Sequence, residues 1–285
     1  MKVLYWLESI RAPWLDAVML AISQLGGEIL FMAIVIALFW CMDKRKGYYL
    51  MTVGFFGIVA NQFLKLVFRV SRPWIRDPEF TIVEGARAGA TGYSFPSGHT
   101  QNAAAVLGCP ARMARKKGLK ITLWVLYALV GISRMYLGVH TPYDVGVGVV
   151  MGLVLVFGLY PFFSEKNYKP QRMYVLLGVM LALSIAFTTY TRLYPFPADI
   201  EVDNLSHGIK NGYTLTGAVA GMLAAFWLDE HYVHFQTAGS LPAHIVKCVV
   251  GLGLLLGIKT VLKPPMNALF GGDPIADAFR YAIVV

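Results

Sequence analysis

Long apolar runs recur along almost the whole chain, and they limit what it can fold into. Eight segments have the length, about 15 to 22 residues, that a helix needs to cross a bilayer core of roughly 30 Å. These segments are 28–42, 48–69, 98–114, 119–137, 143–163, 172–190, 212–228 and 243–262. They predict an all-α fold, a polytopic membrane helix bundle with about eight spans.

The composition agrees with this class. Hydrophobic residues make up 57% of the chain and charged residues only 14%, whereas about a quarter of an ordinary soluble domain is charged. Disordered, fibrous and disulfide-scaffold proteins are therefore excluded. Residues 14–25 are also apolar but would cover only about 18 Å as a helix. They predict a short N-terminal helix, which lies at the interface or crosses the membrane.

The distribution of charge predicts an orientation. The chain has 25 Lys and Arg against 16 Asp and Glu, and much of this excess lies in short loops, where positive charge marks the cytoplasmic side. One set of alternate loops holds 11 Lys and Arg and consists of 43–47, 112–120, 164–172 and 229–243. The opposite set is longer but holds only 7, and it consists of 70–98, 138–142, 191–211 and 263–285. We therefore expect 70–98 and 191–211 on the extracytoplasmic side. Membrane lipids, not nucleic acid, are the expected partners. The lack of a secretory signal pattern favours a bacterial plasma membrane as the location.

No metal or disulfide site is predicted. Cys41, Cys109 and Cys248 are far apart in the sequence and form no CxxC or Cys/His cluster. One polar tract superficially resembles a metal site, but its histidines are loosely spaced and a solvated loop is the better interpretation. This tract contains Asp229, Glu230, His231, His234 and His244.

Ionisable residues are concentrated at one expected depth, near the outer ends of several helices. They are Lys65, Arg69 and Arg72 after one apolar run, His99 before another, Arg134 at the end of a third, and His140 and Asp144 before a fourth. A single Lys or Arg at such a position usually reaches the headgroups. Several that converge at one level indicate a functional site, because ionisable groups near the membrane are costly unless they are paired or used.

The first motif places two cations close together. Lys65 and Arg72 are seven positions apart, which predicts two helical turns and one helix face, and Pro73 is expected to end the helix. Arg72 can hold a phosphate through a bidentate fork, and Lys65 acts as a compact charge.

The second motif is a turn that leads into an Ala-rich helix. Ser97 is a natural N-cap, which is a purely structural role. The first amides of a helix also form an anion site, and Gly98 lets an oxyanion approach the backbone. His99 would lie beside that anion, and an imidazole can donate a proton near neutral pH.

The third motif combines a helix start with a histidine. Thr141, Pro142 and Asp144 form a capping-box pattern, so Asp144 has a structural interpretation. However, His140 lies four residues earlier, and a carboxylate there can bind one ring nitrogen and aim the other at a substrate.

Together, these motifs resemble the type 2 phosphatidic-acid-phosphatase superfamily, which also contains the vanadium haloperoxidases and glucose-6-phosphatase. The family pattern is K-x6-RP, then PSGH, then SR-x5-H-x3-D. The chain matches all eleven fixed positions in order, with Lys65 to Arg72-Pro73, Pro96-Ser97-Gly98-His99, and Ser133-Arg134 to His140 to Asp144. The resemblance is specific over residues 65–152, and outside that range only hydrophobic helices can be compared.

The resemblance implies a role for each matched residue. His140 is the expected nucleophile, which forms a phosphohistidine, and Asp144 orients it. His99 is the expected general acid for the leaving group and then the base for the hydrolytic water. The implied phosphate-binding residues are Lys65, Arg72, Ser97, Gly98 and Arg134. These cations take the electrostatic role that magnesium has in kinases, so the resemblance implies neither a metal nor a cofactor.

The expected activity is that of a lipid phosphate phosphatase. Hydropathy argues against a soluble haloperoxidase, and a site at the membrane surface can receive a lipid headgroup. Undecaprenyl pyrophosphate, phosphatidylglycerophosphate, phosphatidic acid and sphingoid phosphates are candidate substrates, and a soluble sugar phosphate is a further candidate. Transfer of the phosphoryl group to another lipid and a non-catalytic lipid-binding or transport role stay open as alternatives.

We treat 1–285 as a single membrane domain. Residues 28–190 are expected to contain a six-helix phosphatase core with motifs at 65–73, 96–99 and 133–144, and 191–285 to form additional helices. The loops at 74–95 and 191–211 are interpreted as solvated rim loops, with a lid over the pocket as the alternative.

Overall fold

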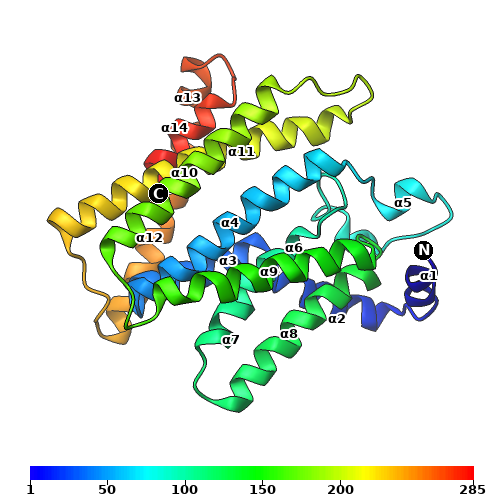
Figure 1. Cartoon of the computed structure of the whole chain (residues 1–285), viewed down its shortest axis with the longest axis horizontal. Helices are drawn as coiled ribbons and strands as arrows, with labels where there is room; N and C mark the ends of the chain where they lie inside the picture. The colour runs from blue at the N-terminus through cyan, green and yellow to red at the C-terminus, as the bar shows by residue number, and fades with distance from the viewer. The chain divides into compact units, whose positions relative to one another are not determined.

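The computed structural model describes residues 1–285, and the chain is helical without a β-strand (Figure 1). The all-α prediction is confirmed. The first part of the chain forms α1 (Lys2–Ser9), α2 (Pro13–Gln24), α3 (Glu28–Cys41), α4 (Lys44–Phe68), α5 (Pro73–Arg76), α6 (Gly98–Ala103), α7 (Cys109–Met113) and α8 (Lys117–Tyr136). The rest forms α9 (Pro142–Phe163), α10 (Pro170–Leu193), α11 (Val202–Leu228), α12 (Leu241–Val261), α13 (Lys263–Leu269) and α14 (Ile275–Val284).

Five helical segments are long and apolar enough to cross a membrane. They are Lys44–Arg76, Lys117–Tyr136, Pro142–Phe163, Pro170–Leu193 and Leu241–Leu269. The predicted span 28–42 reaches this criterion only together with α2, as a pair bent by 44°. Length and composition therefore give five or six candidate spans, and the predicted number of about eight is not confirmed.

The predicted span 98–114 shows why the sequence count is higher. It folds as α6, a π-helical turn at Ala104–Gly108, and α7, and most of it is buried inside the protein. Pro110 lies two residues after the end of this wide turn, at the second position of α7. A proline has no N–H, and its ring crowds the carbonyl four residues earlier, which disfavours a regular α-helix there. The apolar character of this segment serves internal packing.

The chain divides into two compact units. The first contains Met1–Val35 and Tyr49–Pro161, and the second contains Ile36–Tyr48 and Phe162–Val285. All three sequence motifs belong to the first unit.

In the first unit, the N-terminal helices pack against the motif-bearing segments. α2 lies along α8, where the Tyr136 hydroxyl donates to Asp16 at 2.7 Å. α1 holds the loop 74–95, which we call the rim loop. Tyr5 donates to Asp77 at 2.9 Å, and Glu8 accepts from the Thr81 amide at 2.9 Å. The rim loop is therefore attached to the body of the unit at Asp77 and Thr81.

In the second unit, α11 packs between α10 and α14. Gly217 is required at this contact, because a Cβ there would lie 2.0 Å from the Ala278 carbonyl oxygen. The predicted loop 191–211 is mostly helical, since α10 continues to Leu193 and α11 begins at Val202. Only residues 194–201 lie between these helices.

Two pairs of residues that are far apart in sequence meet in the second unit. Lys44 donates to Asp229 at 2.6 Å, and Asp229 is 7% exposed. The interpretation of the 229–243 tract as a solvated loop is therefore wrong at Asp229, because the helix continues through a π-helical turn, Asp229–Val233, and buries it. The thiols of Cys41 and Cys248, both free, have their sulfur atoms 3.5 Å apart.

Candidate active site

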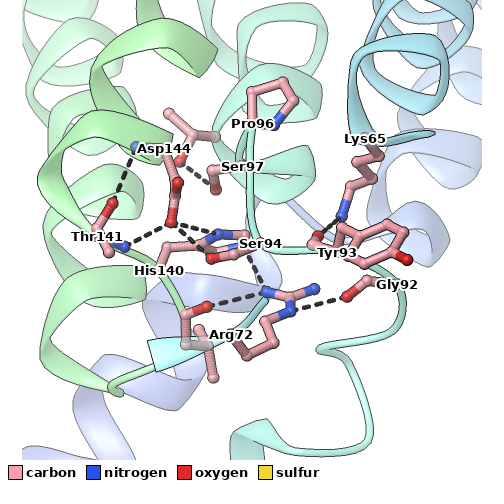
Figure 2. A network of polar contacts seen from close by, with 12 residues as sticks. Lys65, Arg72, Gly92, Tyr93, Ser94, Pro96, Ser97, His140, Thr141 and Asp144 are labelled. Carbon is pink, nitrogen blue, oxygen red and sulfur yellow. Dashed lines mark hydrogen bonds and ion pairs between the residues drawn. The ribbon is translucent and has the colours of Figure 1, made fainter. Parts of the chain in front are cut away.

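Lys65 and Arg72 reach the same site from different segments. α4 ends at Phe68, and Arg69 adopts the left-handed conformation with φ 49°, as residues that end helices often do. The prediction of one helix that carries both cations and is ended by Pro73 is therefore wrong. The residue before a proline avoids the helical region, so Arg72 is extended and Pro73 instead begins α5. The turn still brings both cations to one site (Figure 2).

Arg72 fixes the protonation pattern of His140. It is 4% exposed, and it donates to the carbonyls of Gly92 at 3.0 Å, Thr91 at 2.7 Å and Val139 at 2.9 Å. Its Nη1 also lies 3.0 Å from Nε2 of His140 (Figure 2). A guanidinium has only donors, so Nε2 must be the acceptor and Nδ1 must carry the proton of the neutral ring. Nε2 therefore has the lone pair that a nucleophile needs.

Asp144 lies on the other side of the same ring. Its Oδ2 is 3.6 Å from Nδ1 of His140 and accepts from the Ser94 hydroxyl at 2.6 Å and the Thr141 amide at 2.7 Å (Figure 2). The Thr141 hydroxyl in turn accepts from the Asp144 amide at 3.3 Å. These two reciprocal bonds form the predicted capping box. One carboxylate thus starts α9 and also faces His140.

The turn that carries Ser97 and Gly98 is held by two neighbouring helices. Ser97 is at the N-cap of α6, but its hydroxyl pairs with that of Thr100 at 2.9 Å instead of capping a backbone amide. The Ser97 amide donates to the Asp144 carbonyl at 3.0 Å. From α4, the Asn61 side chain donates to the Pro96 carbonyl at 3.2 Å. Ser97 and Gly98 are therefore fixed relative to both Lys65 on α4 and Asp144 on α9.

Arg134 and His99 complete the group. Arg134 is in the last turn of α8, is 2% exposed, and donates from Nη1 to the Ser23 hydroxyl at 2.6 Å. Its Nε and Nη2 atoms have no hydrogen-bond partner. His99 is half-buried beneath the rim loop, where a methyl group on Gly89 would lie 3.7 Å from its Cε1 atom. Lys65 donates from Nζ to the Tyr93 carbonyl (Figure 2).

Positive charge exceeds negative charge in this site. Lys65, Arg72 and Arg134 are all buried, and Asp144 is the only buried carboxylate of the first unit. Burial, followed by the charges of these cations, lowers the pKa of His99 to about 3 and holds the pKa of His140 well below its usual value. Both rings are therefore neutral at pH 7. Buried cations with unpaired N–H groups are costly, so the arrangement suits an anion.

Sequence comparison with known proteins places the chain in a family. The sequence model of the PAP2 superfamily matches residues 45–168. Phosphatidylglycerophosphatase B of Bacillus subtilis is 34% identical over 172 residues, an alignment that covers 55% of this chain and 79% of that protein. The chain belongs to the PAP2 superfamily.

Other comparisons extend this assignment. The sequence model for the transmembrane extension of PAP2 superfamily phosphatases matches residues 213–285. Together with the apolar helices, this match shows that the chain is an integral membrane protein. Undecaprenyl-diphosphatase BcrC of B. subtilis is 28% identical, with coverage of 52% of this chain and 75% of that protein. A dihydrosphingosine 1-phosphate phosphatase of Schizosaccharomyces pombe is 27% identical, with coverage of 98% and 69%. No solved structure matched the chain.

Three residues around the site were not predicted from the sequence. Ser94 binds Asp144, Asn61 binds the turn before Ser97, and Ser23 binds Arg134. Ser94 lies two residues before the motif Pro96–His99, so its position was a weak signal. Nothing in the sequence pattern distinguishes Asn61 or Ser23 from other polar residues in apolar helices.

Proposed function

We propose that this PAP2 superfamily member is a phosphatase that hydrolyses a lipid phosphate or pyrophosphate through a phosphohistidine. The observation that carries the proposal is the pairing of His140 with its surroundings. Its Nε2 accepts from Arg72, its Nδ1 faces Asp144, and an excess of buried positive charge surrounds the ring.

In the first step, Nε2 of His140 attacks phosphorus. The bond from phosphorus to the leaving oxygen breaks, and His99 donates its proton to that oxygen. The substrate must take over the Arg72 donor that now contacts Nε2. His99 is neutral in the free site. The negative charge of the bound phosphate raises its pKa, so His99 takes up a proton from solvent before it donates one to the leaving oxygen.

In the second step, water attacks the phosphohistidine. His99 accepts a proton from the water, and the phosphorus–nitrogen bond breaks. Its electron pair returns to Nε2 of His140, and inorganic phosphate leaves. Asp144 stabilises the positive charge that the His140 ring carries while phosphorus is bound, because its carboxylate faces Nδ1. The same geometry serves both steps.

We assign binding of the phosphoryl oxygens to Lys65, Arg72 and Arg134, with Ser97 and the Gly98 amide beside them. The unpaired Nε and Nη2 groups of Arg134 support this role. Fixed donors that meet developing negative charge in a buried site are a large source of catalysis. Because these cations supply the positive charge, we propose that turnover needs no metal ion.

The relatives indicate the substrate class. Their names give phosphatidylglycerophosphate, undecaprenyl diphosphate and dihydrosphingosine 1-phosphate phosphatases, which all act on a phosphate group attached to a lipid. We propose a lipid phosphate substrate, a site that faces the extracytoplasmic side as the loop charges predict, and a bacterial plasma membrane as the location. Residues 28–190 are proposed as the phosphatase core and 191–285 as its extension.

Phosphate release by the detergent-purified protein tests the proposal. The panel contains phosphatidylglycerophosphate, phosphatidic acid, undecaprenyl pyrophosphate, a sphingoid phosphate and glucose 6-phosphate, all assayed with EDTA. We expect release from at least one lipid that is lost in His140→Ala and unchanged in His231→Ala, since His231 is an exposed residue of the second unit that pairs with the Trp227 carbonyl one turn earlier. No release from any lipid, or release that needs added metal, contradicts the proposal.

A further inference from the structure

The corner between α2 and α3, residues 23–27, packs against the catalytic segments. In the sequence it precedes residues 45–168, the part of the chain that the PAP2 superfamily model matches. The two helices are bent by 44° across this corner. Ser23, Gly26 and Gly27 are all buried. The break is therefore an internal contact of the first unit.

Gly26 brings the corner directly against the backbone of His99. A Cβ at Gly26 would lie 2.3 Å from the His99 carbonyl oxygen, so no larger residue fits without displacement. Asn102, one turn after His99 on α6, donates to the carbonyls of Gly26 at 3.0 Å and Gly27 at 3.4 Å. The corner is thus bonded to the helix that carries His99.

Ser23 makes the contact that reaches the phosphate-binding groups. Its side chain is fully buried, and its hydroxyl accepts from Nη1 of Arg134 at 2.6 Å. This is the only hydrogen bond of the Arg134 side chain, whose Nε and Nη2 atoms have no partner. A guanidinium is planar, so one short bond at Nη1 restricts the direction in which Nε and Nη2 point.

We propose that Ser23 is a positioning residue for Arg134, and that the α2–α3 corner is part of the phosphate-binding site. This inference rests on the proposed function of the site. A hydroxyl is a neutral acceptor, so it orients the guanidinium and leaves its charge available to the phosphoryl oxygens. A carboxylate at the same place would neutralise that charge.

Three substitutions at one position separate orientation from charge. Ser23→Ala removes the acceptor, Ser23→Thr keeps a hydroxyl, and Ser23→Asp replaces it with a carboxylate. Ser184→Ala is the matched control, because Ser184 is a fully buried helical serine of the second unit whose hydroxyl binds its own helix at Leu181. Each variant is assayed for kcat, KM, inhibition by vanadate and thermal unfolding with and without inorganic phosphate.

We expect Ser23→Ala to lower kcat/KM and weaken vanadate inhibition by the same factor, about 10- to 100-fold, the effect of losing a hydrogen bond to a charged group. Ser23→Thr should recover most of this loss, Ser23→Asp should lose more, and Ser184→Ala should change neither quantity. In an Arg134→Ala background, Ser23→Ala should have less than about a twofold further effect, because the two residues then share no interaction.

A merely structural role for Ser23 would give a different pattern. Unchanged vanadate inhibition in Ser23→Ala, or a full additional loss in the Arg134→Ala background, overturns the inference. If the wild-type protein hydrolyses no lipid phosphate but is stabilised by inorganic phosphate, the proposed function fails. The role of Ser23 is then tested by comparing how much inorganic phosphate stabilises each variant against thermal unfolding. The absence of both hydrolysis and stabilisation overturns both.

Discussion

Asp144→Asn tests whether the carboxylate that faces His140 acts in catalysis or only caps α9. The substitution keeps the shape and the acceptor oxygen that Ser94 and Thr141 can use, but it removes the charge. The contacts to Ser94, Thr141 and His140 all involve the same atom, Oδ2, so the Asn oxygen takes this place and its NH2 group points away from the ring. The loss of charge lowers the rate of phosphohistidine formation.

The distance between the groups sets the magnitude. The Asp144 carboxylate is 3.6 Å from Nδ1 of His140, and the ring gains a positive charge when Nε2 bonds to phosphorus. At an effective dielectric constant of about 20, this charge pair is worth about 5 kcal/mol. That corresponds to roughly a 10³-fold loss of kcat, at about 1.4 kcal/mol for each tenfold change.

The assay is steady-state phosphate release from the best lipid substrate, with thermal unfolding measured in parallel. Asp203→Asn is the matched control, since Asp203 is also in the first turn of a helix but is exposed on α11. We expect both variants to fold and only Asp144→Asn to lose activity. If Asp144→Asn retains activity within about tenfold of the wild type, the carboxylate serves mainly as a cap and our assignment is wrong.

Three further predictions follow from individual contacts. His99→Gln should lower kcat by about 10²- to 10⁴-fold, with a smaller loss for an aryl phosphate whose leaving group needs no proton; an equal loss for both substrates contradicts the general-acid role. Because the pKa of His99 is about 3 in the folded protein and about 6.5 when unfolded, the unfolded state binds more protons between these values, so stability should fall as the pH is lowered from 6.5 towards 3. His99→Gln should reduce that fall, and an identical pH dependence in the variant would argue against a buried neutral imidazole. Copper–phenanthroline oxidation should join Cys41 to Cys248, whose sulfur atoms are 3.5 Å apart, in the wild type and in Cys109→Ser but not in Cys41→Ser; continued maleimide labelling of both thiols after oxidation would contradict this packing.

The motif spacing was sufficient to predict which residues gather at the site, but not how the backbone delivers them. The order His140, Thr141, Pro142, Asp144 predicts a local helix start, and the structure forms it with the expected reciprocal bonds. The prediction for the path from Lys65 to Arg72 is wrong because the helix ends at Phe68, five residues before the proline that was expected to end it. A turn of this kind depends on the backbone conformation at Arg69, which a heptad spacing does not reveal.

Long-range partners were the other limit of the sequence. Ser94 and Asp144 are 50 positions apart, and Ser23 and Arg134 are 111 positions apart. No local pattern links such pairs, because they meet only after the helices pack. Apolar runs likewise do not distinguish a helix that faces lipid from one buried within the protein, so segment 98–114 resembled a span although much of it lies inside the first unit.

Direct detection of the phosphoenzyme is the most decisive measurement for this account. The protein is mixed with its fastest lipid substrate, quenched in alkali, where phosphohistidine survives, and mapped by mass spectrometry. We expect phosphate on His140 and none in His140→Ala. With an aryl phosphate, whose leaving group needs no proton, we expect more phosphoenzyme in His99→Gln, because that variant forms the intermediate but lacks the base for the second step. Turnover without a phosphoenzyme, or phosphate on another side chain, would contradict nucleophilic catalysis by His140.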